Sequence, residues 1–354
     1  MDTQEIEIGP KLHNEIYSAI SPEKFSNSFK GQVVVVTGAS GTIGQAIAQS
    51  FARAGADLYL VAFKSPKLEA IKEKCLSEGA GRVVTARYDL SQSEACESLQ
   101  RDAINTMDHV DVLVNNAGVP GFHTQNLSDF TKDIAVNLHG PVCLLRLFLP
   151  HFMDRRMGCV INVVSRAGSI DVPFNSSYST SKAALIRLTG CVQLEVDMLG
   201  FPDIHLYAMH PGAVLTGMTQ GTCDLGGLDK RSSPLWPFFI NSRSCAATEF
   251  DPNILKHFPD FKTTMSGWLE KFKDSPFLAG MTSVALASGV AKKILRGRYF
   301  DCEQDLGDVL AQGEEISKKP YYTLGVQFPG GLLNDGGMEN LDSEPPNTDF
   351  SLQL

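Results

Sequence analysis

A glycine-rich turn between an apolar run and a helical pattern constrains the fold of this chain more than any other stretch of its sequence. The run Val33–Val36 is β-branched throughout, which is typical of a buried parallel strand. Thr37–Gly44 follows directly and contains three glycines, and residues 45–54 then show a helical pattern. Such glycines let the backbone approach a pyrophosphate, which N–H groups at the start of a helix can bind. We predict a dinucleotide site here; the alternative is a tight turn without a ligand.

Apolar runs and helical patterns alternate along most of the chain. This alternation predicts an α/β fold with a Rossmann-like, doubly wound parallel sheet and helices on both faces. A break near Gly140-Pro141 is expected to interrupt the longest helix. The expected strands cover residues 33–36, 55–62, 82–88, 110–114, 159–164, 204–209 and 298–300, and the expected helices cover 45–54, 92–107, 127–157, 178–199 and 282–296.

The end of the second strand bears on the choice of cofactor. In NAD sites of this kind an acid at the far end of that strand binds the ribose 2′-hydroxyl. Here the stretch Ala62–Lys67 has no acid, and Asp57 lies at the opposite end of the strand. Lys64, Ser65 and Lys67 can instead meet a 2′-phosphate. The sequence therefore favours NADP(H) over NAD(H), although lysines in such a turn are often only solvated.

Polar and small residues follow the other predicted strands. Asp89 can cap the next turn or contact adenine. In Asn115–Gly118 the amides can tie neighbouring strands together, and the last two residues leave room for a flat cofactor. Asn137 stands in an apolar helical stretch, where it is either a satisfied core amide or holds a water and bends the helix. The turn His210–Thr216 can pass over the cofactor, with Thr216 bonding a carboxamide.

The stretch from Ser165 to Lys182 carries the predicted chemistry. Tyr178 and Lys182 are four residues apart, so on a helix both side chains emerge from one face. Ser165 ends the preceding buried strand and can hold a substrate oxygen. A free phenol has a pKa of about 10, which a nearby ammonium lowers toward the range in which an acid/base catalyst works. Taken alone, a tyrosine and a lysine at this spacing also fit an ordinary helix face.

Together these features resemble the short-chain dehydrogenase/reductase family, in its single-domain branch. The resemblance covers residues 31–216 and, more loosely, 282–310. It implies NADP(H) or NAD(H) as cofactor, a small-molecule substrate, and a homodimer or homotetramer formed through the two long helices. The segments 17–22 and 295–299 are similar to fungal members, many of which act in secondary metabolism. The implied cofactor-binding residues are Gly38, Ser40, Gly41, Thr42, Ile43, Gly44, Lys64, Asp89, Leu90, Asn116, Ala117, Gly118, Tyr178, Lys182, Pro211, Gly212, Val214 and Thr216.

The resemblance also implies catalytic roles. Tyr178 would be the general acid/base at a carbonyl or alcohol oxygen, and Lys182 would lower its pKa and bond the nicotinamide ribose. Ser165 would orient the substrate oxygen, and Asn137 would hold a water in a proton relay ending at Lys182. The chain departs from the single-domain pattern at Thr42, which stands where that branch has its middle glycine. Its own spacing is closer to the extended branch, which includes epimerases and dehydratases.

Composition narrows the classes of partner. A formal net charge of −9 and a pI of about 5.4 argue against nucleic acid or an anionic membrane surface as the main partner. The eight cysteines form no Cys-x-x-Cys pair, which favours free thiols over disulfides or a metal site. The acidic stretch Met1–Ile8 does not have the pattern of a secretory signal, and no apolar run approaches the length of a membrane span. We therefore expect a cytoplasmic protein.

The remaining segments suggest how the chain is divided. Residues 1–30 are expected to form an extension that packs on a single domain covering residues 31–338. Residues 217–280 lose the strand–helix alternation, which predicts a substrate lid with an apolar lining. His123 and Trp236 are candidates for the pocket, although a structural role suits each equally well. The acidic, proline-rich tail 339–354 is expected to be disordered.

Three functions are compatible with this sequence. The leading one is an NADP(H)-preferring reductase or alcohol dehydrogenase that interconverts a ketone and a secondary alcohol on a small to medium apolar substrate. The second is an epimerase, dehydratase or cyclase that uses the same pocket, which the glycine spacing and the predicted lid suggest. The third is a cofactor-binding scaffold without catalysis, which the complete set of Asn137, Ser165, Tyr178 and Lys182 disfavours.

Overall fold

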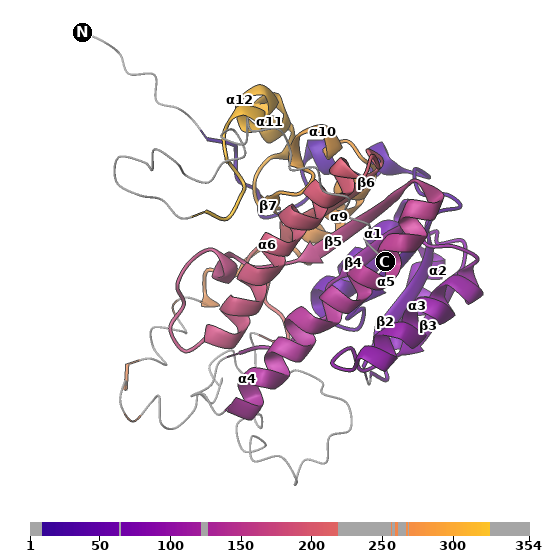
Figure 1. Ribbon diagram of the computed structural model, residues 1–354, viewed down its shortest axis with the longest axis horizontal. Coiled ribbons are helices and arrows are strands. Elements are labelled where there is room, and N and C mark those ends of the chain that lie inside the picture. Colours follow the sequence, from indigo (N-terminus) through magenta and orange to yellow (C-terminus); the bar gives the residue numbers. More distant parts are fainter. Residues whose placement is uncertain are drawn as a thin grey trace, which may run out of the picture. The chain divides into compact units, whose positions relative to one another are not determined.

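Seven parallel strands form the centre of this computed structural model, which describes residues 9–63, 65–121, 127–218 and 269–325 and a few positions between 256 and 267. Their order across the sheet is β3-β2-β1-β4-β5-β6-β7 (Figure 1). The predicted Rossmann-like architecture is therefore confirmed. The strands are β1 Val33–Thr37, β2 Asp57–Ala62, β3 Val83–Arg87, β4 Val112–Asn115, β5 Gly158–Val163, β6 Ile204–His210 and β7 Tyr299–Asp301.

The strand order reverses direction at β1, which pairs with β2 on one side and with β4 on the other. Open α/β sheets bind ligands in the crevice outside the carboxyl ends of the strands at such a switch point. The glycine-rich turn leaves the carboxyl end of β1, and Asn116–Gly118 leave that of β4. The fold thus brings two predicted cofactor segments to the place where a ligand is expected.

Helices cover both faces of the sheet and bury two separate apolar cores. Because successive strand side chains point to opposite faces, Val34 and Val36 of β1 join one core and Val33 and Val35 join the other. Figure 1 shows α5 and α6 in front of the sheet. The first core includes α1 Thr42–Arg53, α2 Leu68–Ser77 and α9 Pro276–Ala287, and the second includes α3 Ser93–Met107, α5 Gly140–Arg155 and α6 Ser176–Met198.

The predicted long helix over 127–157 is irregular one turn earlier than expected. It begins as α4 Leu127–Ile134, passes through a π-helical turn at Ala135–His139, and continues without interruption as α5. The expected break at Gly140-Pro141 is thus wrong. Proline has no N–H for the carbonyl four residues before it, which here is that of Asn137, so the regular α-helical bond is lost within the preceding turn. Such π turns are frequent at functional sites.

The N-terminal segment packs on the domain and contributes to the first core. Tyr17, Ile20, Phe25 and Phe29 are buried there, on or beside the short 3₁₀ turns Ser18–Ile20 and Pro22–Phe25. Its one contact of sheet type is an isolated antiparallel bridge between Leu12 and Gln304, as far as the described residues show.

The C-terminal part of the domain adds short helices that the periodicity did not indicate. They are α11 Leu306–Ala311 and α12 Gly313–Lys318, which follow α10 Lys292–Leu295 and β7. Helix α9 begins at Pro276, before the expected start at 282, because a proline is well suited to the first turn of a helix. Among the helices the structure describes, none combines the length and apolar character needed to cross a bilayer.

Candidate active site

Ser165, Tyr178 and Lys182 meet at the carboxyl end of β5. Ser165 begins a short 3₁₀ turn just after that strand, and its Oγ accepts a bond from the Ala167 N–H at 3.1 Å. Helix α6 carries the other two residues, and the Ser165 hydroxyl lies near the Tyr178 phenol. The Lys182 Nζ lies 5.4 Å from the centre of the Tyr178 ring. The structure therefore joins the hydroxyl, phenol and ammonium that the sequence singled out.

The Lys182 ammonium is buried within the protein, with 4% of the residue exposed. Its Nζ donates to the Val163 carbonyl at 2.7 Å, which fixes the side chain against the end of β5. Burial disfavours the charged form and lowers the pKa of Lys182 to about 8. At neutral pH the side chain is still mostly charged, but it can release its proton far more readily than an exposed lysine.

Burial also determines the ionisation of Tyr178. It raises the pKa of the phenol above its ordinary value, and the nearby Ser165 hydroxyl offsets only part of this increase. The lowering of this pKa by Lys182 stays a prediction; the Lys182 ammonium itself donates to the backbone carbonyl of Val163. The phenol is thus held in its protonated form.

Asn137 lies in the π turn and is fully buried. Its side-chain oxygen accepts from the Val119 N–H at 2.8 Å, and its amide nitrogen donates to the Val119 carbonyl at 3.0 Å. The amide thus ties the helix to the chain that leaves β4. Gly118 lies between the two predicted relay members, since a Cβ there would be 3.2 Å from the Asn137 oxygen and 3.9 Å from the Lys182 nitrogen.

Two further contacts hold the first turn of α6, where Tyr178 lies. The Ser177 hydroxyl donates to the Asp133 carboxylate of α4 at 2.6 Å, and both residues are buried. Gly121 passes so close to this turn that an added Cβ would lie 2.6 Å from the Ser177 Oγ and 2.8 Å from the Tyr178 Cβ. The chain after β4 and helix α4 therefore fix the position of the phenol.

Side-chain amides tie the ends of the central strands together, as predicted. Asn115 donates to the Asn162 oxygen at 2.9 Å, and Asn162 donates to the Thr189 hydroxyl of α6 at 3.0 Å. Asn116 donates to the Thr37 carbonyl at 2.9 Å. These bonds join β1, β4, β5 and α6, so the cofactor segments and the catalytic helix share one rigid frame.

The glycine-rich turn is built for close approach. Gly38 has φ +64, and an added Cβ would lie 2.8 Å from the Ala117 Cα. At Gly44 an added Cβ would lie 2.2 Å from the Gly38 carbonyl oxygen. Helix α1 begins at Thr42, and its N-cap Gly41 supplies no side-chain cap, so the first N–H groups of the helix are left for another acceptor. Ser40 and Ile43 belong to this same turn. The arrangement fits a dinucleotide phosphate.

The structure describes only some of the residues predicted to contact the adenosine half of the cofactor. The Asp89 carboxylate accepts from the Ser91 N–H at 3.1 Å and from the Ser91 hydroxyl at 2.7 Å. Asp89 therefore caps the turn, which is one of the two roles predicted for it. Leu90 is buried beside it. The Ser65 hydroxyl accepts from the Lys67 N–H at 3.2 Å. Lys64 lies outside the described residues, as do His123, Trp236 and most of the predicted lid.

The turn after β6 completes the site. Gly212 has φ +83, which favours glycine, and Pro211 and Val214 are buried. The Ala213 N–H donates to the Asp274 carboxylate at 2.5 Å. Asp274 was not predicted, because it lies 61 residues further along the chain within a stretch without a motif. Thr216 follows on the same segment.

Comparison with known proteins identifies the family. A model of the short chain dehydrogenases matches residues 32–224, more than half of the chain. This chain is a member of that family. A short chain dehydrogenase from the fungus Pseudocercospora fijiensis is 28% identical, over 88% of this chain and 94% of its own. 11-beta-hydroxysteroid dehydrogenase 1A from Arabidopsis thaliana is 32% identical, over 67% of this chain and 68% of its own. The resemblance drawn from the sequence is therefore confirmed, and with it the cofactor class, NADP(H) or NAD(H).

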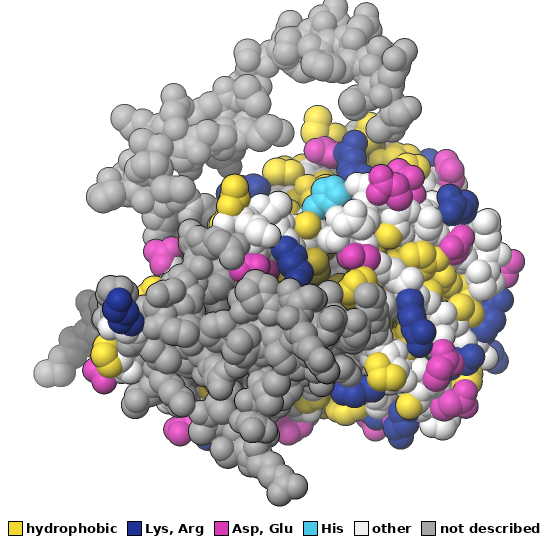
Figure 2. Space-filling view, turned by 90° about the horizontal axis from the view of Figure 1, so that it is seen from below, with side chains coloured by type: hydrophobic (Ala, Val, Ile, Leu, Met, Phe, Trp, Pro, Cys, Tyr) yellow, Lys and Arg dark blue, Asp and Glu magenta, His cyan; other side chains and the backbone are white. Residues whose placement is uncertain are grey.

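A solved structure agrees with the fold. Levodione reductase matches 80% of this chain and 99% of its own with a TM-score of 0.61, at 23% identity. Among the residues that Figure 2 colours, acidic and basic side chains are interspersed with apolar ones.

Proposed function

We propose that this short-chain dehydrogenase interconverts a ketone and a secondary alcohol, with Tyr178 as the general acid/base. The observation that carries the proposal is the meeting of Ser165, Tyr178 and Lys182 beside the glycine-rich turn. A phenol kept protonated by burial is suited to donate its proton to a carbonyl oxygen. The Ser165 hydroxyl, which lies near that phenol, can hold the same oxygen in place.

Lys182 supplies charge to the same reaction. Its ammonium is close to the phenol ring, and its lowered pKa lets it exchange protons near neutral pH. As Tyr178 gives up its proton, a positive charge nearby favours the phenolate that forms. Asn137 would act indirectly, by fixing the segment 118–119 that lies against Lys182.

The cofactor proposed for this site is NADP(H) in preference to NAD(H). When bound, the nicotinamide would supply or accept the hydride. Gly38 and the start of α1 would hold its phosphates, Ala117 and Gly118 would leave space beside it, and the turn 211–216 would close over it. The preference for NADP(H) rests on the lack of an acid in 62–67 and on Lys64.

An apolar substrate is supported by side chains at the carboxyl edge of the sheet. Ile170 follows β5 and is 60% exposed, and Leu215 follows the neighbouring strand β6 and is 40% exposed. Large apolar side chains on both segments that lead away from the site suit a small to medium apolar ketone. We further propose a homo-oligomer, a cytoplasmic location and a role in secondary metabolism, as the sequence predicts.

A pair of tyrosine variants tests the proposed function. Wild-type protein is titrated with NADPH and NADH by fluorescence, and turnover is then measured on a panel of apolar ketones and alcohols. Tyr178→Phe should lower kcat by roughly 10²–10⁴-fold, the range for general acid–base catalysis, while cofactor binding is unchanged. Tyr321→Phe, at an exposed tyrosine outside the site, should behave as wild type. Near wild-type turnover by Tyr178→Phe would refute the proposed role.

A lysine variant tests the choice of cofactor in the same titration. Lys64→Ala should weaken NADPH binding and leave NADH binding unchanged if Lys64 meets the 2′-phosphate. Equal effects on both cofactors, or a preference of the wild type for NADH, would overturn the preference for NADP(H).

A further inference from the structure

Asp274, which lies outside the sheet, hydrogen-bonds the turn that follows β6. Its carboxylate oxygen Oδ2 accepts from the Ala213 N–H at 2.5 Å, and its own N–H donates to the Ala213 carbonyl at 3.1 Å. The residue is 6% exposed and stands just before helix α9. Gly212 is in contact with the same carboxylate, since an added Cβ would lie 2.7 Å from its Oδ2. Asp274 therefore holds this turn through one backbone–backbone hydrogen bond and through its buried carboxylate.

The N-terminal segment orients this carboxylate. Asn14 donates from its side-chain amide to the second oxygen, Oδ1, at 2.5 Å, and its carbonyl accepts from the Ser275 N–H at 2.8 Å. The His13 N–H donates to the Glu303 carbonyl at 2.7 Å, and the Tyr17 hydroxyl donates to that of Gln304 at 2.9 Å. Residues 13–17 thus join the Asp274 loop to the chain after β7.

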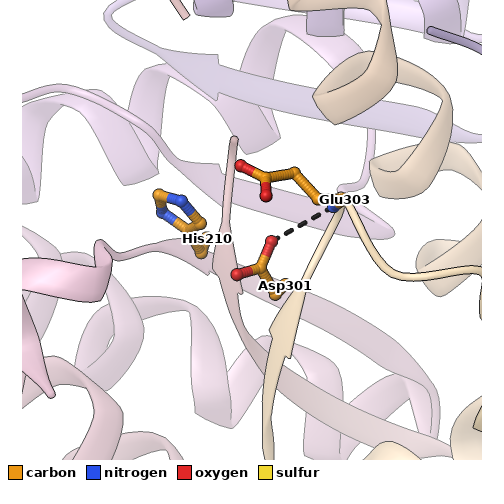
Figure 3. Close-up of side chains that lie close together, drawn as sticks. All are labelled: His210, Asp301 and Glu303. Atoms are coloured by element: carbon orange, nitrogen blue, oxygen red, sulfur yellow. Dashed lines mark hydrogen bonds between the residues drawn. The ribbon is translucent and has the colours of Figure 1, made fainter. Parts of the chain in front are cut away.

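A third set of groups faces Asp274 from the ends of β6 and β7. Figure 3 shows His210, Asp301 and Glu303 close together, with the Glu303 N–H donating to the Asp301 carboxylate. The Asp274 side chain also lies near that of Glu303. Burial and the neighbouring acids Asp274 and Asp301 raise the pKa of Glu303 to about 7.

A metal ion is not needed to explain this cluster. The ligand atoms of His210, Asp301 and Glu303 lie within 4.8 Å of one another, as in a metal site. The Arg166 guanidinium already bonds Asp301 at 2.7 Å and Glu303 at 2.5 Å. Burial lowers the pKa of His210 to about 4, which leaves the imidazole neutral. The positive charge at this place is therefore that of the arginine.

We propose that Asp274 is a positioning residue, which holds the turn Pro211–Ala213 in its cofactor-binding shape, and that Asn14 orients it. This inference rests on the proposed function, in which that turn closes over the dinucleotide. Without the Asp274 carboxylate the half-buried Ala213 N–H, which follows the left-handed residue Gly212, would lose its acceptor. The role is indirect, since Asp274 acts through the backbone of Ala213.

Variants at Asp274 test the proposal in the full-length chain. NADPH affinity, kcat and the thermal midpoint are measured for Asp274→Ala, Asp274→Asn and a matched control, Asp203→Asn, which removes an exposed carboxylate paired with Lys292 at 2.7 Å. Loss of a charge-assisted backbone bond predicts NADPH binding roughly 10–100-fold weaker in Asp274→Ala. Asp274→Asn keeps one acceptor and should recover part of that affinity. At saturating NADPH, kcat should change less than affinity, and the control should match wild type.

A milder variant keeps the test informative if Asp274→Ala does not fold. Asn14→Ala removes only the bond to Oδ1 and should weaken NADPH binding several-fold with little change in kcat. Unchanged NADPH affinity in Asn14→Ala and in a folded Asp274→Ala would overturn the positioning role. Failure of the wild type to bind either NADPH or NADH would instead overturn the proposed function itself, so the two failures are distinguishable.

The pH dependence provides a second readout. Above about pH 7 Glu303 becomes negatively charged near the Asp274 carboxylate, so the two groups repel each other and NADPH affinity should fall. Glu303→Gln stays neutral at every pH and should remove this decrease. An identical pH profile in Glu303→Gln and wild type would argue against the role of Glu303. The charged and titratable groups that face Glu303 are Arg166, His210, Asp274, Tyr299, Asp301 and Cys302.

Discussion

Replacing Lys182 with methionine should abolish turnover and yet stabilise the protein at neutral pH. An ammonium buried in the folded state has a pKa of about 8, against 10.5 for an exposed lysine. A difference of this size corresponds to about 3 kcal/mol of stability lost at neutral pH. Methionine has a similar length and no charge to desolvate. It gives up the bond to the Val163 carbonyl, which is worth roughly 1 kcal/mol, so a net gain of about 2 kcal/mol is expected.

The pH dependence of stability tests this reasoning more directly. Between about pH 8 and 10.5 the unfolded chain binds a proton at Lys182 that the folded chain does not, so wild-type stability from this group rises with pH. Below pH 8 both states bind the proton, and the contribution is constant. The stability advantage of Lys182→Met should therefore be largest near pH 7 and shrink by about 2 kcal/mol by pH 10.

Urea unfolding of both proteins at pH 7 and pH 10 measures the difference. Lys293→Met, which removes an exposed ammonium on α10, is the matched control and should show no such change with pH. A Lys182→Met protein that is less stable than wild type at both pH values, or whose advantage does not change with pH, would refute the burial explanation for Lys182.

Three further changes follow from the packing of the site and the surface of α6. Gly44→Ala should destabilise the protein and abolish dinucleotide binding, because its Cβ would lie 2.2 Å from the Gly38 carbonyl oxygen. In Gly41→Ala the Cβ would lie 3.5 Å from the same oxygen, so this variant should retain binding. Calorimetry and NADPH titration compare the two variants. Asn162→Ala should cost about 1–3 kcal/mol in urea unfolding, since it removes two buried hydrogen bonds, one from Asn115 and one to Thr189. Leu194 and Met198 are 58% and 80% exposed on α6, so the double change to glutamate should dissociate the proposed oligomer in light scattering.

The sequence was informative wherever the relevant signal is local. Strand β1 and the turn after it could be predicted because β-branched residues, glycines and a helical pattern stand side by side in Val33–Arg53. Tyr178 and Lys182 could be paired because helix geometry fixes the relation of residues four apart. The amide bridge at Asn115 was also expected, since parallel strands end at one edge of the sheet.

Contacts between distant segments could not be predicted in the same way. Asn14 and Asp274 are 260 residues apart, and nothing in either stretch indicates that a turn after β6 brings them together. The π turn around Asn137 and the upward pKa shift of Tyr178 also depend on tertiary packing. Spacing predicted that the ammonium and phenol would be close, but only the structure shows that Lys182 donates to Val163 and that burial raises the pKa of Tyr178.

The two sides of the proposed cofactor site are held by different kinds of structure. On the side of β1 and β4, Asn115, Asn116 and Thr37 bond directly across neighbouring strands, within the ladder of the sheet. On the side of β6, the turn at Gly212 is held by Asp274, which depends in turn on an N-terminal segment outside the sheet. Local opening requires less free energy where loops, and not strands, make the contacts. The turn after β6 is therefore the part of the site that should loosen first, so a change at Asn14 can alter cofactor affinity while the chemistry at Tyr178 stays intact.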